Sequence, residues 1–187
     1  LVLEVGADRP GDIQKVSEWL KPDVVVFTAI GKTPVHVEYF ANTDKLVEEK
    51  SHLVKALKST GVFIYTEDDS KVSDIKNKTK AERFSFGFSE SSYFKASHDE
   101  IFYDKNGDPA GVRFRIDAEG SSIPVVLNGV TGKQHIYPVL AAAAAAGTYY
   151  APMWYSGDSW NANRAESFAS HLGSSLSGAI AASSTAL

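Results

Sequence analysis

The chain has 187 residues and a mass of 20.2 kDa, with 43% hydrophobic and 22% charged residues, so it is long and apolar enough to bury a core. Its 19 Lys and Arg against 23 Asp and Glu give a formal net charge of -4, which excludes an overall basic field for nucleic acid or an anionic membrane. There are no cysteines, which excludes disulfides and thiolate metal sites.

The sequence carries no signal for membrane insertion or export. A span needs roughly 20 apolar residues, and the longest candidate, 136–147, is shorter and mostly alanine. The chain begins at Leu1, with no basic segment and no cleavage site of a signal peptide. We therefore expect a piece of a longer cytoplasmic protein.

Strand-like and helix-like runs alternate in the first half of the chain. The patterns predict strands at 1–5, 23–28, 62–66 and 82–86, and helices at 12–20, 43–58 and 69–77. The run at 23–28 is nearly all β-branched or aromatic, which is typical of a strand buried on both faces. This βαβα order predicts an α/β fold with a mostly parallel sheet flanked by helices.

From Tyr93 onward the pattern changes to an antiparallel one. Turn signals separate expected strands at 94–103, 112–117 and 122–127, which together predict a β-meander. An alanine-rich helix at 133–146 closes a first domain at 1–147. The last segment, 148–187, holds nine Ser, eight Ala and a group of Tyr and Trp but only three charged residues, so we expect an atypical tail of unknown role.

Two Gly-Lys pairs invite comparison with a phosphate-binding loop, and both have the wrong spacing. Such a loop needs an additional glycine five residues earlier, so that backbone amides can surround the phosphates. For Gly31-Lys32-Thr33 that position is Val26, and for Gly132-Lys133 it is Leu127. Neither pair predicts a phosphate loop.

Three polar residues fall where an open α/β sheet binds its ligands, near the carboxyl ends of strands or on the adjoining helix. They are Glu4, His36 and Lys50. A glutamate with a histidine suits a hard divalent cation that keeps several waters and binds phosphates. Each also has an ordinary explanation, as a paired acid, a surface histidine and a solvated lysine, and spacing alone leaves both interpretations open.

Several short motifs follow one another in a characteristic order. They are LEVGADRPGDI at 3–13, TAIG at 28–31, PVHVEYF at 34–40, EKSHL at 49–53, EDD at 67–69 and GKQHIYP at 132–138. This order resembles the E-x-G-A-x-x-x-G-[DE]-I, T-N-I-G, A-H-x-E-x-F, K-x-E-I, N-x-D-D and G-x-H-N-x-x-N-A-x-A-A elements of the Mur ligase family. The resemblance covers roughly 1–147 and is strongest to the type that adds D-alanyl-D-alanine to a UDP-N-acetylmuramoyl-tripeptide.

The resemblance implies part of the P-loop-like central domain of a cytoplasmic, ATP-dependent amide ligase of peptidoglycan precursor synthesis and cell wall biogenesis. In that family the glutamate and histidine bind the Mg²⁺ that accompanies ATP, and the lysine is carbamylated. These roles correspond to Glu4, His36 and Lys50, while Gln134 and His135 correspond to nucleotide contacts, or on an ordinary interpretation to helix-start caps.

The implied reaction joins a UDP-muramoyl-peptide to a dipeptide. The substrate carboxylate attacks the γ-phosphate to give an acyl phosphate, and an amine then displaces phosphate to form the amide. Such a transfer depends mainly on positioning and charge neutralisation.

The sequence also departs from the family pattern. Ala29 replaces an asparagine, two extra residues separate Gly31 from His36, and the later asparagine pair is His135 and Pro138. The phosphate loop of the family lies upstream of the Glu4 segment and is not in this chain, so we expect the isolated chain to be inactive. The alternatives are a non-catalytic α/β binding or scaffold protein and, among enzymes, a folylpolyglutamate synthetase.

Overall fold

The structure, a computed structural model, describes residues 1–30 and 39–154. His36 and residues 155–187 of the predicted tail lie outside the described residues. The chain divides into two compact units, Leu1–Phe84 and Ser85–Leu187. No helix in the described part of the chain combines the length and the apolar character needed to cross a membrane.

Six strands form one mixed sheet, in which they follow one another in chain order. The pairs β1–β2 and β3–β4 are parallel, whereas β4–β5 and β5–β6 are antiparallel. The predicted α/β fold with a β-meander is therefore confirmed. The strands are β1 (Val24–Phe27), β2 (Val62–Thr66), β3 (Glu82–Gly87), β4 (Phe94–Tyr103), β5 (Pro109–Ala118) and β6 (Ser121–Asn128).

The helices of the first unit follow the predicted apolar periodicity, but two of them end early. The amide of Lys58 donates to the Pro22 carbonyl at 3.3 Å, so the backbone beyond Ala56 serves a tertiary contact rather than another helical turn. The other is the helix predicted at 69–77, where the carbonyl of Lys76 accepts from the Arg83 guanidinium at 2.9 Å. The helices here are α1 (Asp12–Trp19), α2 (Thr43–Lys55), α3 (Ser70–Ser73) and the 3-10 turn η2 (Lys76–Lys78).

The predicted strand at 1–5 is not formed, and this prediction was wrong. Leu1 and Val2 are fully exposed and Leu3 is half exposed. An apolar run becomes a strand only when a neighbour completes its ladder of hydrogen bonds, and no described residue pairs with this segment. The predicted burial of β1 on both faces also fails at Val26, whose side chain is 40% exposed while those of Val25 and Phe27 are buried.

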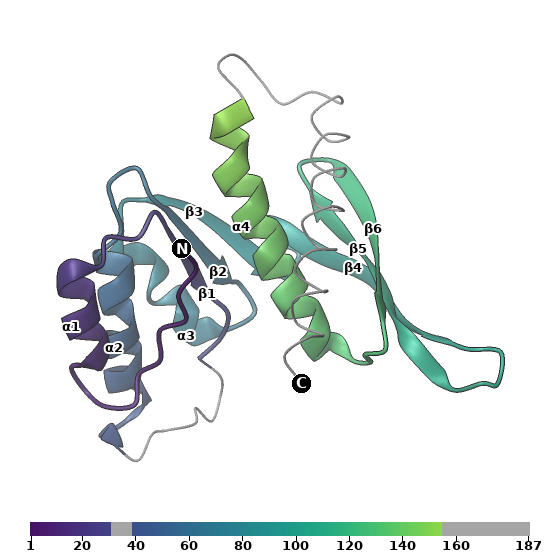
Figure 1. Cartoon of the computed structure of the whole chain (residues 1–187), viewed down its shortest axis with the longest axis horizontal. Coiled ribbons are helices and arrows are strands. Elements are labelled where there is room, and N and C mark those ends of the chain that lie inside the picture. Colours follow the sequence, from purple (N-terminus) through teal and green to yellow (C-terminus); the bar gives the residue numbers. More distant parts are fainter. Residues whose placement is uncertain (31–38, 155–187) are drawn as a thin grey trace. The chain divides into compact units, whose positions relative to one another are not determined.

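The core of the first unit lies between β1, β2 and the helices α1 and α2, which lie side by side (Figure 1). Phe63 of β2 is fully buried, meets Phe27 edge to face at 5.8 Å and stacks on Tyr65 at 5.3 Å. Ile13 of α1 and Val54 of α2 are almost completely buried in the same cluster. The apolar stripes of both helices thus face the same two strands.

A buried carboxylate joins the two helices. Glu49 of α2 is only 6% exposed, and its Oε1 accepts hydrogen bonds from the backbone amides of Ile13 at 2.8 Å and Gln14 at 3.0 Å. These amides belong to the first turn of α1, where N–H groups have no partner within the helix. Gly11, the residue at the N-cap of α1, has no side chain to cap them. Glu49 therefore caps α1 from 35 or 36 residues away.

In the second unit the long helix α4 (Ile136–Trp154) follows the 3-10 turn η3 (Lys133–His135) and contacts β4. Ile136, Leu140 and Ala143 of α4 are fully buried. A helix rich in alanine can lie close to a sheet because its side chains are short. The helix runs past Gly147 to Trp154, so the predicted segment 148–187 begins inside it.

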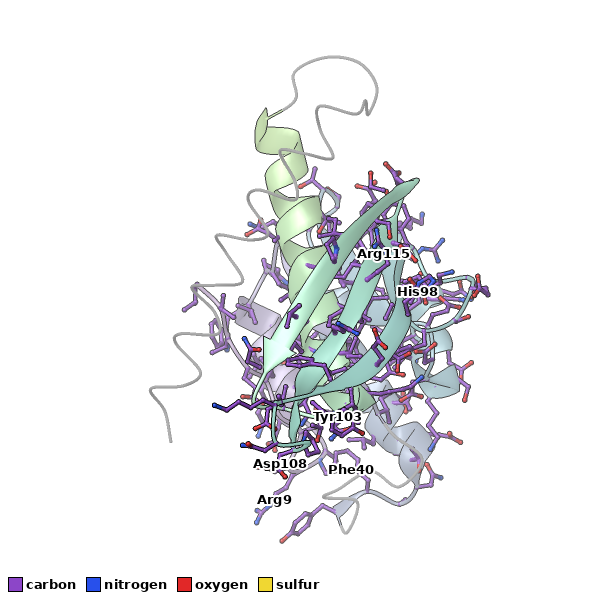
Figure 2. The ribbon with its side chains drawn as sticks, turned by 90° about the vertical axis from the view of Figure 1, so that its right-hand side faces the viewer. Arg9, Phe40, His98, Tyr103, Asp108 and Arg115 are labelled. Carbon is purple, nitrogen blue, oxygen red and sulfur yellow. The ribbon has the colours of Figure 1, made fainter. Side chains whose placement is uncertain are left out.

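The packing of the meander is closest at Gly111 of β5. A Cβ atom at this position would lie 2.2 Å from the Leu127 carbonyl oxygen and 2.6 Å from the ring of Phe102. Only glycine lets the backbone approach so closely. Beyond this point β4 and β5 continue to a turn, near which Tyr103 and Asp108 are seen in Figure 2.

The contact made by Glu49 leads to a prediction about stability. Hydrogen bonds to a charged acceptor contribute about 1.5–3 kcal/mol each, so Glu49→Ala should lower the free energy of unfolding by about 3 kcal/mol or more. Glu49→Gln keeps an oxygen that can accept from both amides and should cost about 1 kcal/mol. Urea denaturation followed by circular dichroism measures both values.

The matched control is Glu48→Ala. Glu48 is the neighbouring residue, is exposed and pairs with Lys45 at 2.9 Å, so its removal should leave the urea midpoint nearly unchanged. Equal destabilisation by the two alanine variants would show that Glu49 is not the buried cap.

Candidate functional site

The candidate site lies in the first unit, at the edge of the sheet where two parallel strands end. β1 and β2 are parallel, so their carboxyl ends lie at the same edge, where open α/β sheets bind ligands. β1 leads to the buried residue Ile30, and β2 leads to the EDD motif at 67–69. The segments that follow β1 and β2 therefore belong to the edge at which a ligand is expected.

Asp69 links the two strand ends. Its Oδ2 accepts from the backbone amide of Ile30 at 2.8 Å, and its Oδ1 accepts from the backbone amide of Lys71 at 3.0 Å. Asp69 thereby caps α3 with one oxygen and holds the segment after β1 with the other. Asp69 belongs to the EDD motif but is not among the predicted site residues, although an aspartate directly before a helical turn is a typical N-cap.

Lys50 of α2 is half-buried and is not an ordinary solvated lysine. Burial lowers the pKa of its amine, and the negative charge of Asp69 opposes this effect without cancelling it. A larger share of the Lys50 amine is therefore neutral at a given pH than in an exposed lysine. The neutral form is the nucleophilic one, which is the state that covalent modification of a lysine requires.

The two predicted metal residues differ in what the structure says of them. Glu4 is exposed, and its carboxylate is a hard oxygen ligand of the kind that Mg²⁺ prefers. His36 lies outside the described residues. Within residues 1–30 and 39–154, no three His, Asp or Glu side chains form a group that could hold a metal ion. The charge of Asp69 acts on the Lys50 amine, whereas Glu4 belongs to no such group within the described residues.

The predicted nucleotide residues lie in the second unit, at the start of α4. Gln134 and His135 are exposed, and the side-chain Nε2 of Gln134 donates to the Thr131 carbonyl at 3.2 Å. Neither side chain caps the helical turn that contains it, since the turn has no side-chain cap. Beside them, Lys133 pairs with Asp99 at 3.2 Å and lies 4.6 Å from the ring centroid of Phe88.

A second polar cluster on the antiparallel sheet does not have the geometry of a nucleophilic site. The Ser97 hydroxyl donates to Asp117 at 2.5 Å, and His98 Nδ1 lies 3.1 Å from the same hydroxyl. Because the hydroxyl proton points to the aspartate, the histidine cannot remove it as a general base. Ser122 also donates to Asp117, and Arg115 donates to Ser122 at 2.6 Å. Figure 2 shows Arg115 and His98 on this sheet.

Comparison with known protein families places this arrangement. The model of the Mur ligase middle domain matches residues 1–146, which is most of the chain. The chain belongs to the Mur ligase family. The resemblance inferred from the ordered motifs is thereby confirmed.

Three of the similar proteins illustrate the relationship. The chain is 26% identical over 152 residues to the UDP-N-acetylmuramoyl-tripeptide–D-alanyl-D-alanine ligase of Bacillus subtilis, an alignment that covers 80% of this chain and 29% of that protein. MurF from Acinetobacter baumannii matches with a TM-score of 0.65 and 24% identity, over 77% of this chain and 30% of that one. MurF from Thermotoga maritima, solved in complex with ADP, matches with a TM-score of 0.63 and 21% identity, over 76% and 31%.

The chain corresponds to only a part of each of these relatives. The two solved structures share the fold of this chain. The chain spans less than a third of the length of each of these three proteins.

The environment of Lys50 leads to a prediction about its reactivity. Competitive labelling with acetic anhydride over a range of pH, read by mass spectrometry, should give Lys50 a midpoint below the ordinary lysine value, because burial disfavours its charged form. Lys45 on the same helix provides the internal reference. Its hydrogen bond and charge interaction with Glu48 raise its pKa, so its midpoint should lie above that value. A midpoint of Lys50 equal to or above that of Lys45 would refute the described environment.

Proposed function

We propose that this chain is part of an ATP-dependent amide ligase of peptidoglycan precursor synthesis, which adds a dipeptide to a UDP-muramoyl-peptide through an acyl phosphate. The proposal is supported by the match to the Mur ligase middle domain and by the ligase from Bacillus subtilis, whose name states this pair of substrates. The observation that carries it is the position of Lys50, which corresponds to the family's lysine and is half-buried, so that burial lowers the pKa of its amine.

Lys50 is the proposed carbamylated lysine. The lone pair of its neutral amine attacks the carbon of carbon dioxide, a new N–C bond forms, and one proton leaves the nitrogen for solvent. The product is a carbamate, which replaces the positive charge by a negative one on a longer side chain. Burial favours the neutral amine that starts this step.

Glu4 and His36 are the proposed Mg²⁺ residues, and Gln134 and His135 are the proposed nucleotide contacts. When bound, Mg²⁺ would supply charge neutralisation for phosphoryl transfer from ATP. The exposed carboxylate of Glu4 is of the right chemical kind to bind it. The exposed side chains of Gln134 and His135 offer hydrogen-bond donors and acceptors for a nucleotide. Because the reaction consumes ATP, we place the protein in the cytoplasm.

The role of the isolated chain follows from its Gly-Lys pairs. Neither has the spacing of a phosphate loop, so we propose that residues 1–187 alone do not turn over ATP. We propose that residues 1–147 form one domain and that residues 148–187 are an atypical tail.

Carbamylation tests the role of Lys50 directly. In ¹³C-labelled bicarbonate the chain should show one additional carbonyl signal in the carbamate region of the ¹³C spectrum, and Lys50→Arg should abolish it. Lys45→Arg, the matched change on an exposed lysine of the same helix, should leave it in place. Absence of the signal in the unsubstituted chain, or its survival in Lys50→Arg, would favour the non-catalytic scaffold instead.

Ligation tests the proposed reaction. The complete gene product, supplied with ATP, Mg²⁺, UDP-N-acetylmuramoyl-tripeptide and D-alanyl-D-alanine, should release ADP and form the amide product, detected by mass spectrometry. Lys50→Ala should reduce the rate by at least about a hundredfold, because loss of one positioned charged group has effects of this order. Lys45→Ala should retain the full rate. Equal rates of the two variants would exclude Lys50 from the reaction.

A further inference from the structure

We propose that Asp69 is a positioning residue of the candidate site, whose carboxylate holds the ends of β1 and β2 together and fixes the surroundings of the Lys50 amine. The link to catalysis rests on the role proposed for Lys50. The structural link between the strand ends does not depend on that role.

The two oxygens of Asp69 have different partners on different elements. Oδ2 accepts from the amide of Ile30, 39 residues away in the sequence, and Oδ1 accepts from the amide of Lys71, two residues away. Capping α3 would need only the second contact, and α3 is a single turn of four residues. The contact with Ile30 is therefore additional to helix capping and fixes the backbone that leaves β1.

A carboxylate is the group that this geometry requires. Both partners are backbone N–H donors, so both side-chain oxygens must accept. An asparagine has one acceptor oxygen and an NH₂ group, and the latter would face one of the two donors. A buried N–H without an acceptor is costly, and Ile30 is buried. The substitution Asp69→Asn would therefore remove at least one contact as well as the charge.

The Asp69 carboxylate also affects the amine of Lys50, which belongs to helix α2. Its negative charge favours the ammonium form of Lys50 and so moderates the effect of burial on that amine. The same residue thereby sets the backbone at the strand ends and the charge balance at the amine.

Two readouts test the proposal in the full 187-residue chain. Amide hydrogen exchange should be about tenfold or more faster at Ile30 in Asp69→Ala than in the unsubstituted chain, since its acceptor is lost. In Asp69→Asn, acetic anhydride labelling should place the midpoint of Lys50 at a lower pH, because the charge that favours the ammonium is gone. Asp68→Asn removes the same charge from the neighbouring exposed residue and should change neither value.

The direction of the midpoint separates positioning from a loss of structure. If Asp69→Asn merely loosened the fold, Lys50 would become solvated and its midpoint would move upward to the ordinary lysine value. That result, or an unchanged exchange rate at Ile30, would overturn the proposal. Asp69→Glu keeps the charge and two acceptor oxygens, so it should restore the Lys50 midpoint, and it serves as the second variant if Asp69→Asn does not fold.

Failure of this proposal is distinguishable from failure of the proposed function. A missing ¹³C carbamate signal at Lys50 would reject the ligase role while leaving the effects of Asp69 on exchange and labelling measurable. Unchanged exchange and labelling with a carbamate present would reject Asp69 alone.

Discussion

The buried carboxylate of Glu49 is the constraint on which the arrangement of the first unit depends. It accepts from two backbone amides at the start of α1, whose N-cap residue is Gly11 and has no side chain. Without Glu49, a buried helix end would lose its acceptor. Since neighbouring residues on a helix point about 100° apart, holding Glu49 against α1 also sets the direction of Lys50.

Asp69 joins segments of this unit through backbone amides as well. Glu49 accepts from two backbone N–H groups with one oxygen, Asp69 accepts from one with each of its two oxygens, and each carboxylate joins segments far apart in the sequence. The negative charge of Asp69 acts on the half-buried amine of Lys50. The candidate site is therefore held by its backbone contacts, and its one perturbed lysine follows from burial beside a fixed charge.

Local patterns predicted most of the elements, because apolar spacing along a helix or strand is itself a local property. The strand β2 and the start of α2, with Asn42 as its N-cap, agree with the sequence. The segment at 1–5 failed because a strand needs a paired neighbour, which its own residues cannot supply. The predicted end of α2 was wrong for a related reason, because the backbone contact of Lys58 with Pro22 is a tertiary one.

The site was predictable only where a motif marked it. Lys50 could be selected because an ordered set of motifs resembles the Mur ligases, although no pattern around it indicates burial. Glu49 is the preceding residue and looks like one more surface acid of α2. Its partners, like that of Asp69 at Ile30, lie at least 35 residues away, and single-sequence reasoning has no signal for such contacts.

Lys50 is the proposed modified lysine of a ligase site, and the charge of Asp69 acts on its amine. A high-resolution crystal structure of the chain grown in bicarbonate tests this proposal most directly. We expect density for a carbamate on the Lys50 nitrogen, with Asp69 still within hydrogen-bond distance of the Ile30 amide. An unmodified Lys50 directed into solvent, with Asp69 turned away from Ile30, would contradict it.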